Sequence, residues 1–329
     1  MTRYAHQLSD LRRTDEPAFG GKSASLGDLL AAGIPVPPGF ALATSAYEAF
    51  ASTLSQRTQA AMQKASVPDA VREEVIDRYN ELAQDIGQSD PPVAVRSSAV
   101  GEDSEEATFA GQQESFLWVR GGDAVCDAVR DCWASLYTER AVSYRTERAG
   151  ANTEPTMGVA VQLMVDAALS GVMFTCNPVS GDPSMIAINA SWGLGLAVVG
   201  GEVTPDDYLV SKITREVVRE HIHEKHIEYV PDAQGRGAVT RNVEPHRQTA
   251  RTLDKAAIER LVEVGRGIER HFGSHQDIEW AIARGDGGEL YVVQSRPVTT
   301  APQRDPKPAP ASALSLVMNT FGVKTDDGA

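Results

Sequence analysis

Residues Asp277 to Thr299, DIEWAIARGDGGELYVVQSRPVT, carry the pattern on which the fold prediction depends. Acidic and apolar residues alternate up to Ala283, a glycine-rich turn follows, and an apolar run leads back to Gln294. This pattern predicts two antiparallel strands joined by a turn. Successive side chains of a strand point to opposite faces, so the hairpin can bring Glu279, Gln294 and Arg296 together on one polar face.

That polar face has the chemistry of a metal and phosphate site. The carboxylate of Glu279 and the amide oxygen of Gln294 are hard ligands of the kind that Mg2+ prefers. The guanidinium of Arg296 suits a phosphate group. An ordinary amphipathic hairpin with a charged outer face shows the same alternation, so the hairpin alone does not separate the two interpretations.

Composition limits the classes of protein to consider. The chain has 329 residues, of which 42% are hydrophobic and 23% charged, as in a soluble globular protein. Its net charge of −14 argues against nucleic-acid and anionic-membrane partners, although it allows a local basic pocket. The N-terminus lacks the apolar stretch of a signal peptide, and the three cysteines form no CxxC pair, so we expect a cytoplasmic protein.

A glycine pair precedes a predicted helix near the N-terminus. Gly20, Gly21 and Lys22 lead into a helix expected from Ser23 to Ala32. Backbone N–H groups at a helix start favour an anion, and Lys22 would add a positive charge. The spacing is not that of a Walker loop, and such a tripeptide is also common in plain turns.

Two further stretches are compatible with nucleotide binding. Val93–Val95 is a predicted strand with Arg96 at its end, followed by a small, acidic segment that suits either a mobile lid or a plain surface loop. Met157–Asn177 is a predicted strand, turn and strand. Its segment Val159–Val165, interrupted by Gln162, suits an adenine-binding hinge or a simple core hairpin.

Four stretches together resemble one family, the N-terminal ATP-binding domain of phosphoenolpyruvate synthase and pyruvate phosphate dikinase. Rifampin phosphotransferase and phenylphosphate synthase share this domain. The stretches, in the same order as in the family, are GGKSASLGDLLAAGIPVPPGF, VAVRSSAVGEDSEEATFAGQQES, FTCNPVSGD with SWGLGLAVVGGEVTPDDY, and QDIEWAI with LYVVQSRPVT. The resemblance implies an α+β protein with the ATP-grasp fold, which holds ATP between two subdomains.

The resemblance also implies a domain division. It predicts an ATP-binding domain over residues 1–300, with an N-terminal subdomain at about 1–190 and a C-terminal subdomain at about 191–300. Residues 301–329 contain four prolines among small and charged residues, which is typical of a tail or linker.

Family roles transfer to matching positions of this sequence. Lys22 and Arg96 would hold the phosphates of ATP, and the loop from Thr108 to Gly111 would cover them. The hinge would comprise residues 162–165. Its implied nucleotide contacts are Gln162, Met164 and Val165. Glu279 and Gln294 would ligate Mg2+, and Arg296 would neutralise the transferred phosphoryl group, so Lys22, Arg96 and Arg296 are the predicted catalytic residues.

Several positions depart from the family pattern. The usual GGKGANL is GGKSASL here, and Asn189 and Leu196 replace acidic residues that usually flank the tryptophan-glycine motif. The dikinases pass phosphate to a histidine on a swivelling domain, and no glycine-rich Thr…Ser-His segment is found. His275 follows a serine but lies in the nucleotide-binding part, so we interpret it as structural. We expect no acceptor barrel after residue 300.

The predicted function is therefore that of the ATP-binding subunit of a split dikinase. It would bind Mg-ATP and transfer a phosphoryl or pyrophosphoryl group to a histidine on a partner subunit, which would also bind the final small-molecule acceptor, with release of AMP and phosphate. Two alternatives stay open. The chain could be a stand-alone phosphotransferase acting on a small molecule, or a non-catalytic subunit that senses ATP.

Overall fold

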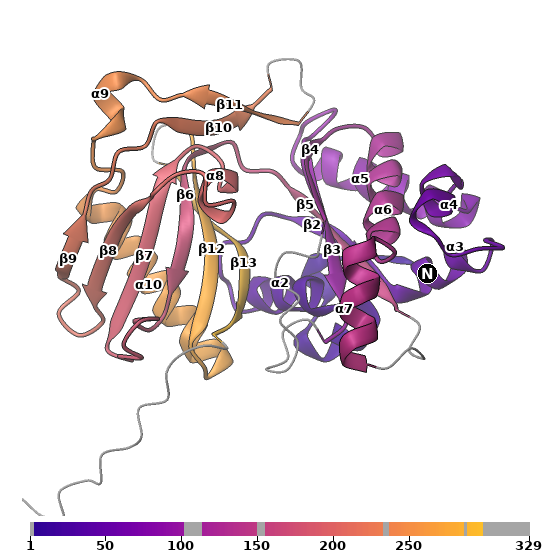
Figure 1. The fold of residues 1–329 in the computed structure, drawn as a ribbon, viewed down its shortest axis with the longest axis horizontal. Helices are drawn as coiled ribbons and strands as arrows, with labels where there is room; N and C mark the ends of the chain where they lie inside the picture. Colours follow the sequence, from indigo (N-terminus) through magenta and orange to yellow (C-terminus); the bar gives the residue numbers. More distant parts are fainter. Residues whose placement is uncertain (1–2, 102–113, 150–154, 233–236, 286–287, 299–329) are drawn as a thin grey trace, which may run out of the picture.

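The computed structural model describes residues 3–101, 114–149, 155–232, 237–285 and 288–298. Two antiparallel sheets face each other in this part of the chain, and helices cover their outer sides (Figure 1). The predicted α+β class is confirmed. In the described residues, no helix is both long enough and apolar enough to cross a membrane.

The first sheet has five strands in the order β1-β2-β5-β3-β4, and every neighbouring pair is antiparallel. Their bounds are Ala5–Gln7 (β1), Gly39–Leu42 (β2), Val93–Ala99 (β3), Ser115–Val119 (β4) and Met157–Leu163 (β5). Alternation sorts the side chains of β2 onto opposite faces: Phe40 and Leu42 join one core and Ala41 another.

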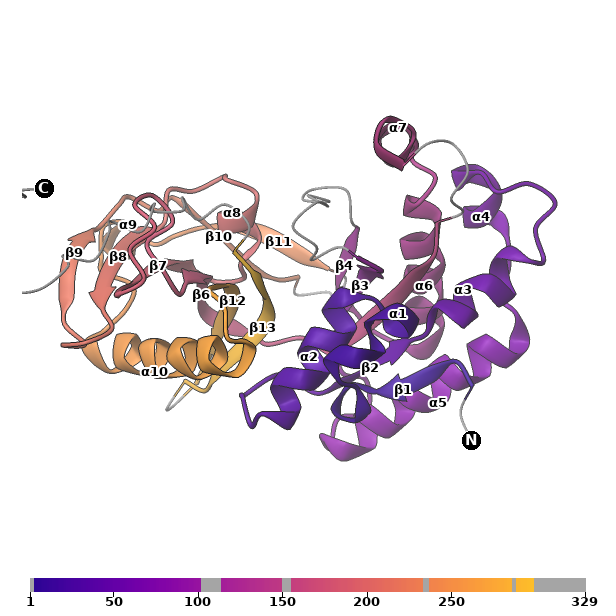
Figure 2. The same cartoon turned by 90° about the horizontal axis from the view of Figure 1, so that it is seen from below.

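Helices cover the two faces of this sheet differently. The outer face packs against several helices through apolar residues such as Phe50, Val75 and Trp133. These outer elements are α3 (Thr44–Ala51), α4 (Gln59–Lys64), α5 (Asp69–Asp85) and α6 (Gly122–Ser135), with α7 (Glu139–Ala149) following. Two 3-10 turns (Leu8–Asp10 and Arg13–Asp15), α1 (Glu16–Phe19) and α2 (Gly21–Ala31) lie on the inner side. There α2 lies beside β13 of the second sheet (Figures 1 and 2).

The second sheet has six strands in the order β13-β12-β6-β7-β8-β9, again all antiparallel. Their bounds are Ala167–Phe174 (β6), Met185–Trp192 (β7), Asp206–Ser211 (β8), Val217–His221 (β9), Gln276–Ala283 (β12) and Leu290–Pro297 (β13). The amphipathic helix α10, Lys255–Phe272, covers one face (Figure 2). Ile278, Trp280 and Ile282 point to that helix, as the alternation predicted.

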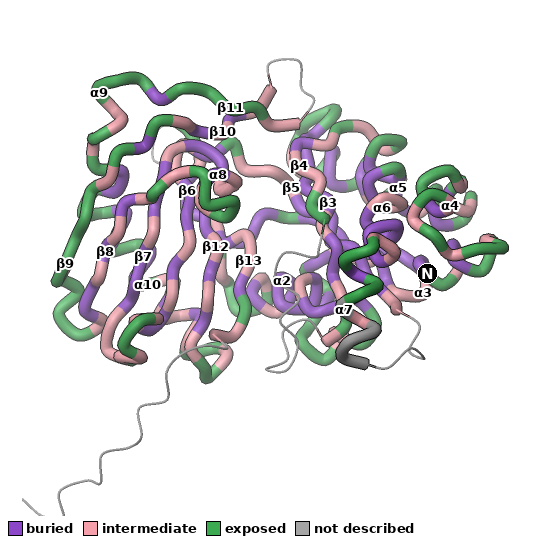
Figure 3. The backbone as a smooth tube through the Cα atoms, viewed as in Figure 1, coloured by how far each residue is buried: buried purple, intermediate pink, exposed green. Residues whose placement is uncertain are grey.

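Smaller elements lie at the rim of the second sheet. They are α8 (Leu196–Val199), the two-stranded ribbon of β10 (Ile227–Pro231) and β11 (Ala238–Asn242), and α9 (Pro245–Gln248). The strand interiors are buried, whereas β9 and β11 are largely exposed (Figure 3). Bridges from Gly193 and Leu194 to Tyr229 attach the ribbon to the loop after β7.

Two boundaries differ from the sequence-based expectation. The sheets divide between Leu163 and Ala167, earlier than the expected residue 190, because β6 pairs with β7 and β12 rather than with β5. Arg96 does not end its strand. It lies in the middle of β3, opposite Ala160 of β5 and Ser115 of β4, because the polar residues after it continue the strand pairing.

Candidate active site

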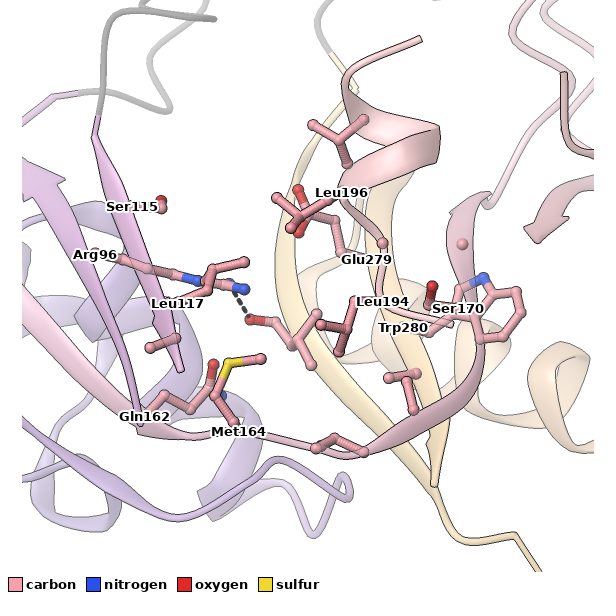
Figure 4. A pocket seen from close by; sticks show the side chains of 18 of the residues that line it. Arg96, Ser115, Leu117, Gln162, Met164, Ser170, Leu194, Leu196, Glu279 and Trp280 are labelled. Carbon is pink, nitrogen blue, oxygen red and sulfur yellow. Dashed lines mark hydrogen bonds between the residues drawn. The ribbon is translucent and has the colours of Figure 1, made fainter. Parts of the chain in front are cut away.

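A cavity of about 200 Å3 opens between the two sheets (Figure 4). Both sheets, their connecting segment and the glycine-rich loop after β7 contribute to it. The lining residues are Ala94, Arg96, Ser115, Leu117, Gln162, Leu163, Met164, Val165, Ala167, Ser170, Gly171, Leu194, Gly195, Leu196, Val199, Glu279, Trp280, Ala281 and Val293.

The predicted hinge forms one wall of this cavity. Residues 164–166 cross from the first sheet to the second, so the alternative of a simple core hairpin is wrong. The N–H groups of Leu163 and Met164 already donate to the carbonyls of Pro38 and Pro92, both at 2.9 Å. The polar group that the fold leaves for a ligand here is the Gln162 amide. It is 2% exposed, and its Nε2 has no hydrogen-bond partner among the described residues.

An unpaired buried N–H costs about 1–3 kcal/mol, and a ligand atom that accepts from Gln162 would offset that cost. The wall around it is apolar, with Met164 and Leu117 drawn on the same side of the cavity (Figure 4). An apolar slot with one buried donor suits a flat heteroaromatic base that carries an acceptor nitrogen or oxygen.

The opposite wall carries the predicted metal ligands. Glu279 of β12 lines the cavity and lies directly opposite Gln294 of β13 in the strand register. Opposed residues of an antiparallel pair point to the same face, so this carboxylate and this amide share one face of the hairpin. The register shifts between Glu279 and Trp280, which leaves Val293 as an extra residue in a β-bulge.

The chemistry of these donors fits a magnesium ion shared with a nucleotide. No group of three or more His, Cys, Asp or Glu side chains in the described residues could hold a metal alone. Mg2+ is usually held by one or two carboxylates together with substrate phosphates and water. Along the same sheet row the next carboxylate belongs to Asp207, three strands from Glu279 and so about 14 Å away. That distance is too great to share one ion.

Arg296 lies one row further along β13, where it faces Asp277. Its Nε and Nη2 atoms are 2.9 and 2.8 Å from the Asp277 carboxylate. Burial raises the pKa of Asp277, Arg296 opposes that shift, and the charge of Glu279 adds to it. The hairpin thus gathers Glu279, Gln294 and Arg296 on one face, as predicted, although Gln294 and Arg296 are not among the residues lining the cavity.

Arg96 reaches the cavity from the first sheet. Its Nη1 atom donates to the carbonyl of Val293 at 3.2 Å, across the space between the sheets (Figure 4). The bulge at Val293 therefore presents this carbonyl to the arginine. The bond places a guanidinium in the same cavity as Glu279, which is the pairing of charges that a metal-bound polyphosphate needs.

Lys22 lies in the first turn of α2 and is not among the residues that line the cavity. The start of this helix is held against β3 by close packing. Gly20 has a φ of 78°, and a Cβ there would lie 1.9 Å from the carbonyl oxygen of Ser98. The N–H of Ser23 also donates to Ser98 Oγ at 3.1 Å. Only glycine fits at position 20, so the glycine pair sets the approach of α2 to the strand of Arg96.

The remaining predicted residues, Thr108 and Gly111, lie outside the described part of the chain. Sequence reasoning missed several lining residues, notably Leu117, Ser170 and Val293. Ser170 falls in a segment expected to be a turn and Leu117 in a segment given no element, although both lie in strands, and no local signal shows which strand faces a cavity. The glycine-rich run after Trp192 was the one available hint of a lining loop.

A second cavity, of about 690 Å3, lies at the start of α10. Arg251, Lys255 and Arg260 line it, and none of the predicted site residues does. Arg251 is paired with Glu220 at 2.9 Å, and Arg260 donates to the carbonyl of Gly288. These partners occupy the two arginines within the fold, so the cavity between the sheets is the better candidate.

Comparison with known families agrees with this geometry. Residues 16–314 match the pyruvate phosphate dikinase, AMP/ATP-binding domain. The chain therefore belongs to this family and is an ATP-binding domain of the phosphoenolpyruvate synthase-like dikinases. Its two sheets with the cavity between them have the ATP-grasp arrangement that the resemblance implied.

Individual relatives are similar over almost the whole chain. A probable phosphoenolpyruvate synthase of Methanothermobacter thermautotrophicus is 42% identical over 91% of this chain and 46% of its own length. The phosphoenolpyruvate synthase of Pyrococcus furiosus is 37% identical over 91% of this chain and 44% of its own length. The chain thus spans less than half the length of these two relatives.

Solved structures give a weaker match. The acetyl-coenzyme A synthetase 1 of Ca. Korarchaeum cryptofilum superposes with a TM-score of 0.37 and 12% sequence identity, covering 89% of this chain and 92% of that one. A score this low supports no structural argument.

Proposed function

We propose that this chain binds Mg-ATP between its two sheets and transfers a phosphoryl-containing group to a histidine supplied by another domain or subunit. One observation carries the proposal. A single cavity holds the orphaned amide of Gln162, the guanidinium of Arg96 and the carboxylate of Glu279. These are the groups that a base, a polyphosphate and a metal ion respectively require.

Different residues would bind the base, the phosphates and the metal ion of Mg-ATP. The slot at Gln162, Met164 and Val165 would hold adenine. Arg96 would bind phosphate oxygens in exchange for its bond to Val293, and Glu279 with Gln294 would hold the ion. Bound Mg2+ would neutralise phosphate charge and orient the polyphosphate for in-line attack. The work of the protein would be positioning and charge stabilisation.

The histidine would come from outside this cavity. All seven histidines of the chain lie in described residues, and none of them lines the cavity. His275 is held by Glu269, with Nδ1 2.6 Å from the carboxylate, and His271 lies 2.9 Å from Asp28. These partners agree with a structural role for both, as proposed for His275.

The proposed reaction balances in two steps. An imidazole nitrogen of the acceptor histidine attacks the β-phosphorus of ATP and loses its proton to solvent. The bond from the β-phosphorus to the oxygen that bridges it to the α-phosphorus breaks, and AMP leaves with that oxygen and the electron pair. Water then cleaves the pyrophosphorylated histidine to phosphate and phosphohistidine. A small-molecule acceptor bound by the partner would take up the remaining phosphoryl group.

The test is product analysis with radiolabelled ATP. The purified chain would be incubated alone and then with a candidate subunit that carries a phosphoacceptor histidine. We expect AMP, phosphate and acid-labile label on the partner in the mixture, and none of these with Glu279→Gln. ADP from the chain alone would instead indicate a stand-alone phosphotransferase. A partner activity that is stimulated equally by wild type and Glu279→Gln would indicate a regulatory subunit.

A further inference from the structure

A chain of buried hydrogen bonds leads from α2 through β13 to β12 and on to Thr175, the residue after β6. Ser25 Oγ in α2 donates to the carbonyl oxygen of Ser295 in β13 at 2.9 Å. Ser295 Oγ in turn donates to Oε1 of Gln276 in β12 at 3.0 Å, and the N–H of Gln276 donates to Thr175 Oγ1 at 2.8 Å. All four residues are buried, with no more than 5% of any one exposed. Such satisfied buried networks fix one arrangement of the elements they join.

The position of Ser295 gives this network its functional meaning. It lies between Gln294 and Arg296, so its side chain points away from their face and is free to bind Gln276. Ser295 therefore holds Gln294 and Arg296 in place, because its hydroxyl is bonded to β12 and its carbonyl to α2.

β13 is the edge strand of its sheet, and the first subdomain makes hydrogen bonds to three of its backbone groups. The N–H of Val292 donates to the carbonyl of Pro35 at 2.8 Å, and Arg96 donates to the carbonyl of Val293 at 3.2 Å. Ser25 makes the third of these bonds, to Ser295. An edge strand would otherwise present unpaired polar groups, so these bonds attach β13 to both subdomains at once.

We propose that Ser25 is a positioning residue for the polyphosphate, because its bond to Ser295 sets the distance between α2 and β13. Lys22 precedes Ser25 by three residues, one helical turn earlier on the same side of α2. The bond therefore fixes Lys22 relative to the row of Gln294 and Arg296. This inference rests on the proposed function, since it gives Ser25 a role in holding Mg-ATP.

Four proteins test the proposal: the wild-type chain, Ser25→Ala, Ser25→Thr and Ser135→Ala. Ser25→Ala removes the hydroxyl, whereas Ser25→Thr keeps it. Ser135 is a matched control, a buried helical serine whose Oγ donates to the Cys132 carbonyl at 2.7 Å within α6, away from the cavity. Calorimetric titrations with Mg-ATP and with AMP would be run on each full chain, with a melting curve to confirm folding.

We expect Ser25→Ala to weaken Mg-ATP binding about fivefold, as for the loss of one buried hydrogen bond. AMP should bind within about twofold of wild type in every variant, because it lacks the phosphates that α2 and β13 hold together. Ser25→Thr should restore Mg-ATP binding, and Ser135→Ala should leave it unchanged.

Three outcomes would overturn the proposal. Unchanged Mg-ATP affinity in Ser25→Ala would show that the bond positions nothing. Equal weakening of AMP and Mg-ATP would show that Ser25 supports the fold in general. If Ser25→Thr is folded but binds like Ser25→Ala, the hydroxyl is not the group that matters. Failure of the wild-type chain to bind Mg-ATP would instead contradict the proposed function itself, and this inference with it.

Discussion

The two sheets that enclose the cavity contribute different chemistry to it. Among the described residues that line the cavity, the first sheet supplies a mostly apolar wall with one buried amide, at Gln162, and one cation, at Arg96. The second supplies a hairpin whose polar face carries Asp277, Glu279, Gln294 and Arg296 in opposed pairs, with Glu279 lining the cavity. The first wall is suited to binding a base, and the second to holding a metal and the reacting phosphates.

This difference follows from how the strands are buried. In the first sheet, β5 is central and buried, so its residues are apolar except for Gln162. In the second, β13 is the edge strand and β12 lies between it and β6, and alternation gives one face of both strands to α10 and leaves the other for polar residues. We therefore expect substitutions in the first sheet to change mainly nucleotide binding and substitutions in the second to change mainly phosphoryl transfer.

The largest expected effect is on phosphoryl transfer, from a substitution in the hairpin of the second sheet. Glu279→Gln should lower phosphoryl transfer at least about 100-fold, because a neutral amide is a poorer metal ligand than a carboxylate. Binding of AMP should change little. The measurement is label transfer beside AMP titration, with Glu289→Gln as control, since Glu289 is an exposed residue of the same hairpin that does not line the cavity. A fully active Glu279→Gln would remove the distinction between the walls.

The next effect concerns Arg96, which lines the cavity from the first sheet. Arg96→Met should weaken Mg-ATP binding about 10- to 100-fold through loss of charged hydrogen bonds to phosphate. Arg251→Met, at the second cavity, is the control and should bind Mg-ATP normally. Both variants would be titrated with Mg-ATP. Weakened binding in Arg251→Met with normal binding in Arg96→Met would indicate that the nucleotide binds in the cavity at the start of α10.

Substitutions of the buried amides of Gln162 and Gln276 should change the free energy of unfolding in opposite directions. Gln162→Met should weaken ATP binding up to about tenfold and yet raise the free energy of unfolding by about 1 kcal/mol, because an unpaired buried N–H is removed. Gln276→Met should lower it by about 1–3 kcal/mol, because the buried hydroxyl of Ser295 loses its acceptor. Denaturant unfolding measures both. A destabilised Gln162→Met would show that its amide is satisfied in the folded protein.

The smallest effect on function is expected far from the cavity, at Glu74. Burial raises the pKa of its carboxyl, but the backbone N–H groups of Arg3, Tyr4 and Ala5 donate to it and lower the pKa overall. Glu74→Gln should therefore cost about 1–2 kcal/mol at pH 7 with ATP binding intact.

The sign of the pH dependence follows from the lowered pKa. The contribution of Glu74 is complete above the ordinary glutamate pKa of about 4.3 and is lost as pH falls through its lower folded value. The difference in unfolding free energy between wild type and Glu74→Gln should thus shrink in acid. A constant difference from pH 7 to pH 3 would contradict this account.

Local pattern predicted the hairpin well and its surroundings poorly. Alternation predicted that Glu279, Gln294 and Arg296 share one face, because side chains alternate along a strand, but the register that sets Glu279 opposite Gln294 comes from the structure. The glycine pair before Lys22 likewise marked a tight approach, which Gly20 makes to Ser98.

The features that could not be predicted depend on contacts between distant parts of the chain. The bond from Ser25 to Ser295 spans 270 residues, and neither serine has a local pattern that distinguishes it. The bulge at Val293 and the division of the sheets at residues 164–166 depend on which strands pair, which no single segment specifies. Arg96 was found from sequence, but its place in mid-strand was not.

The most direct test of the central claim is a crystal structure of the chain with a non-hydrolysable ATP analogue and Mn2+, which marks the metal by its anomalous scattering. We expect the base beside Gln162 and Met164. We expect the metal within about 2.3 Å of oxygen atoms of Glu279 and Gln294, with Arg96 moved from Val293 to a phosphate. A nucleotide in the cavity at the start of α10, or a metal bound without Glu279, would contradict that claim.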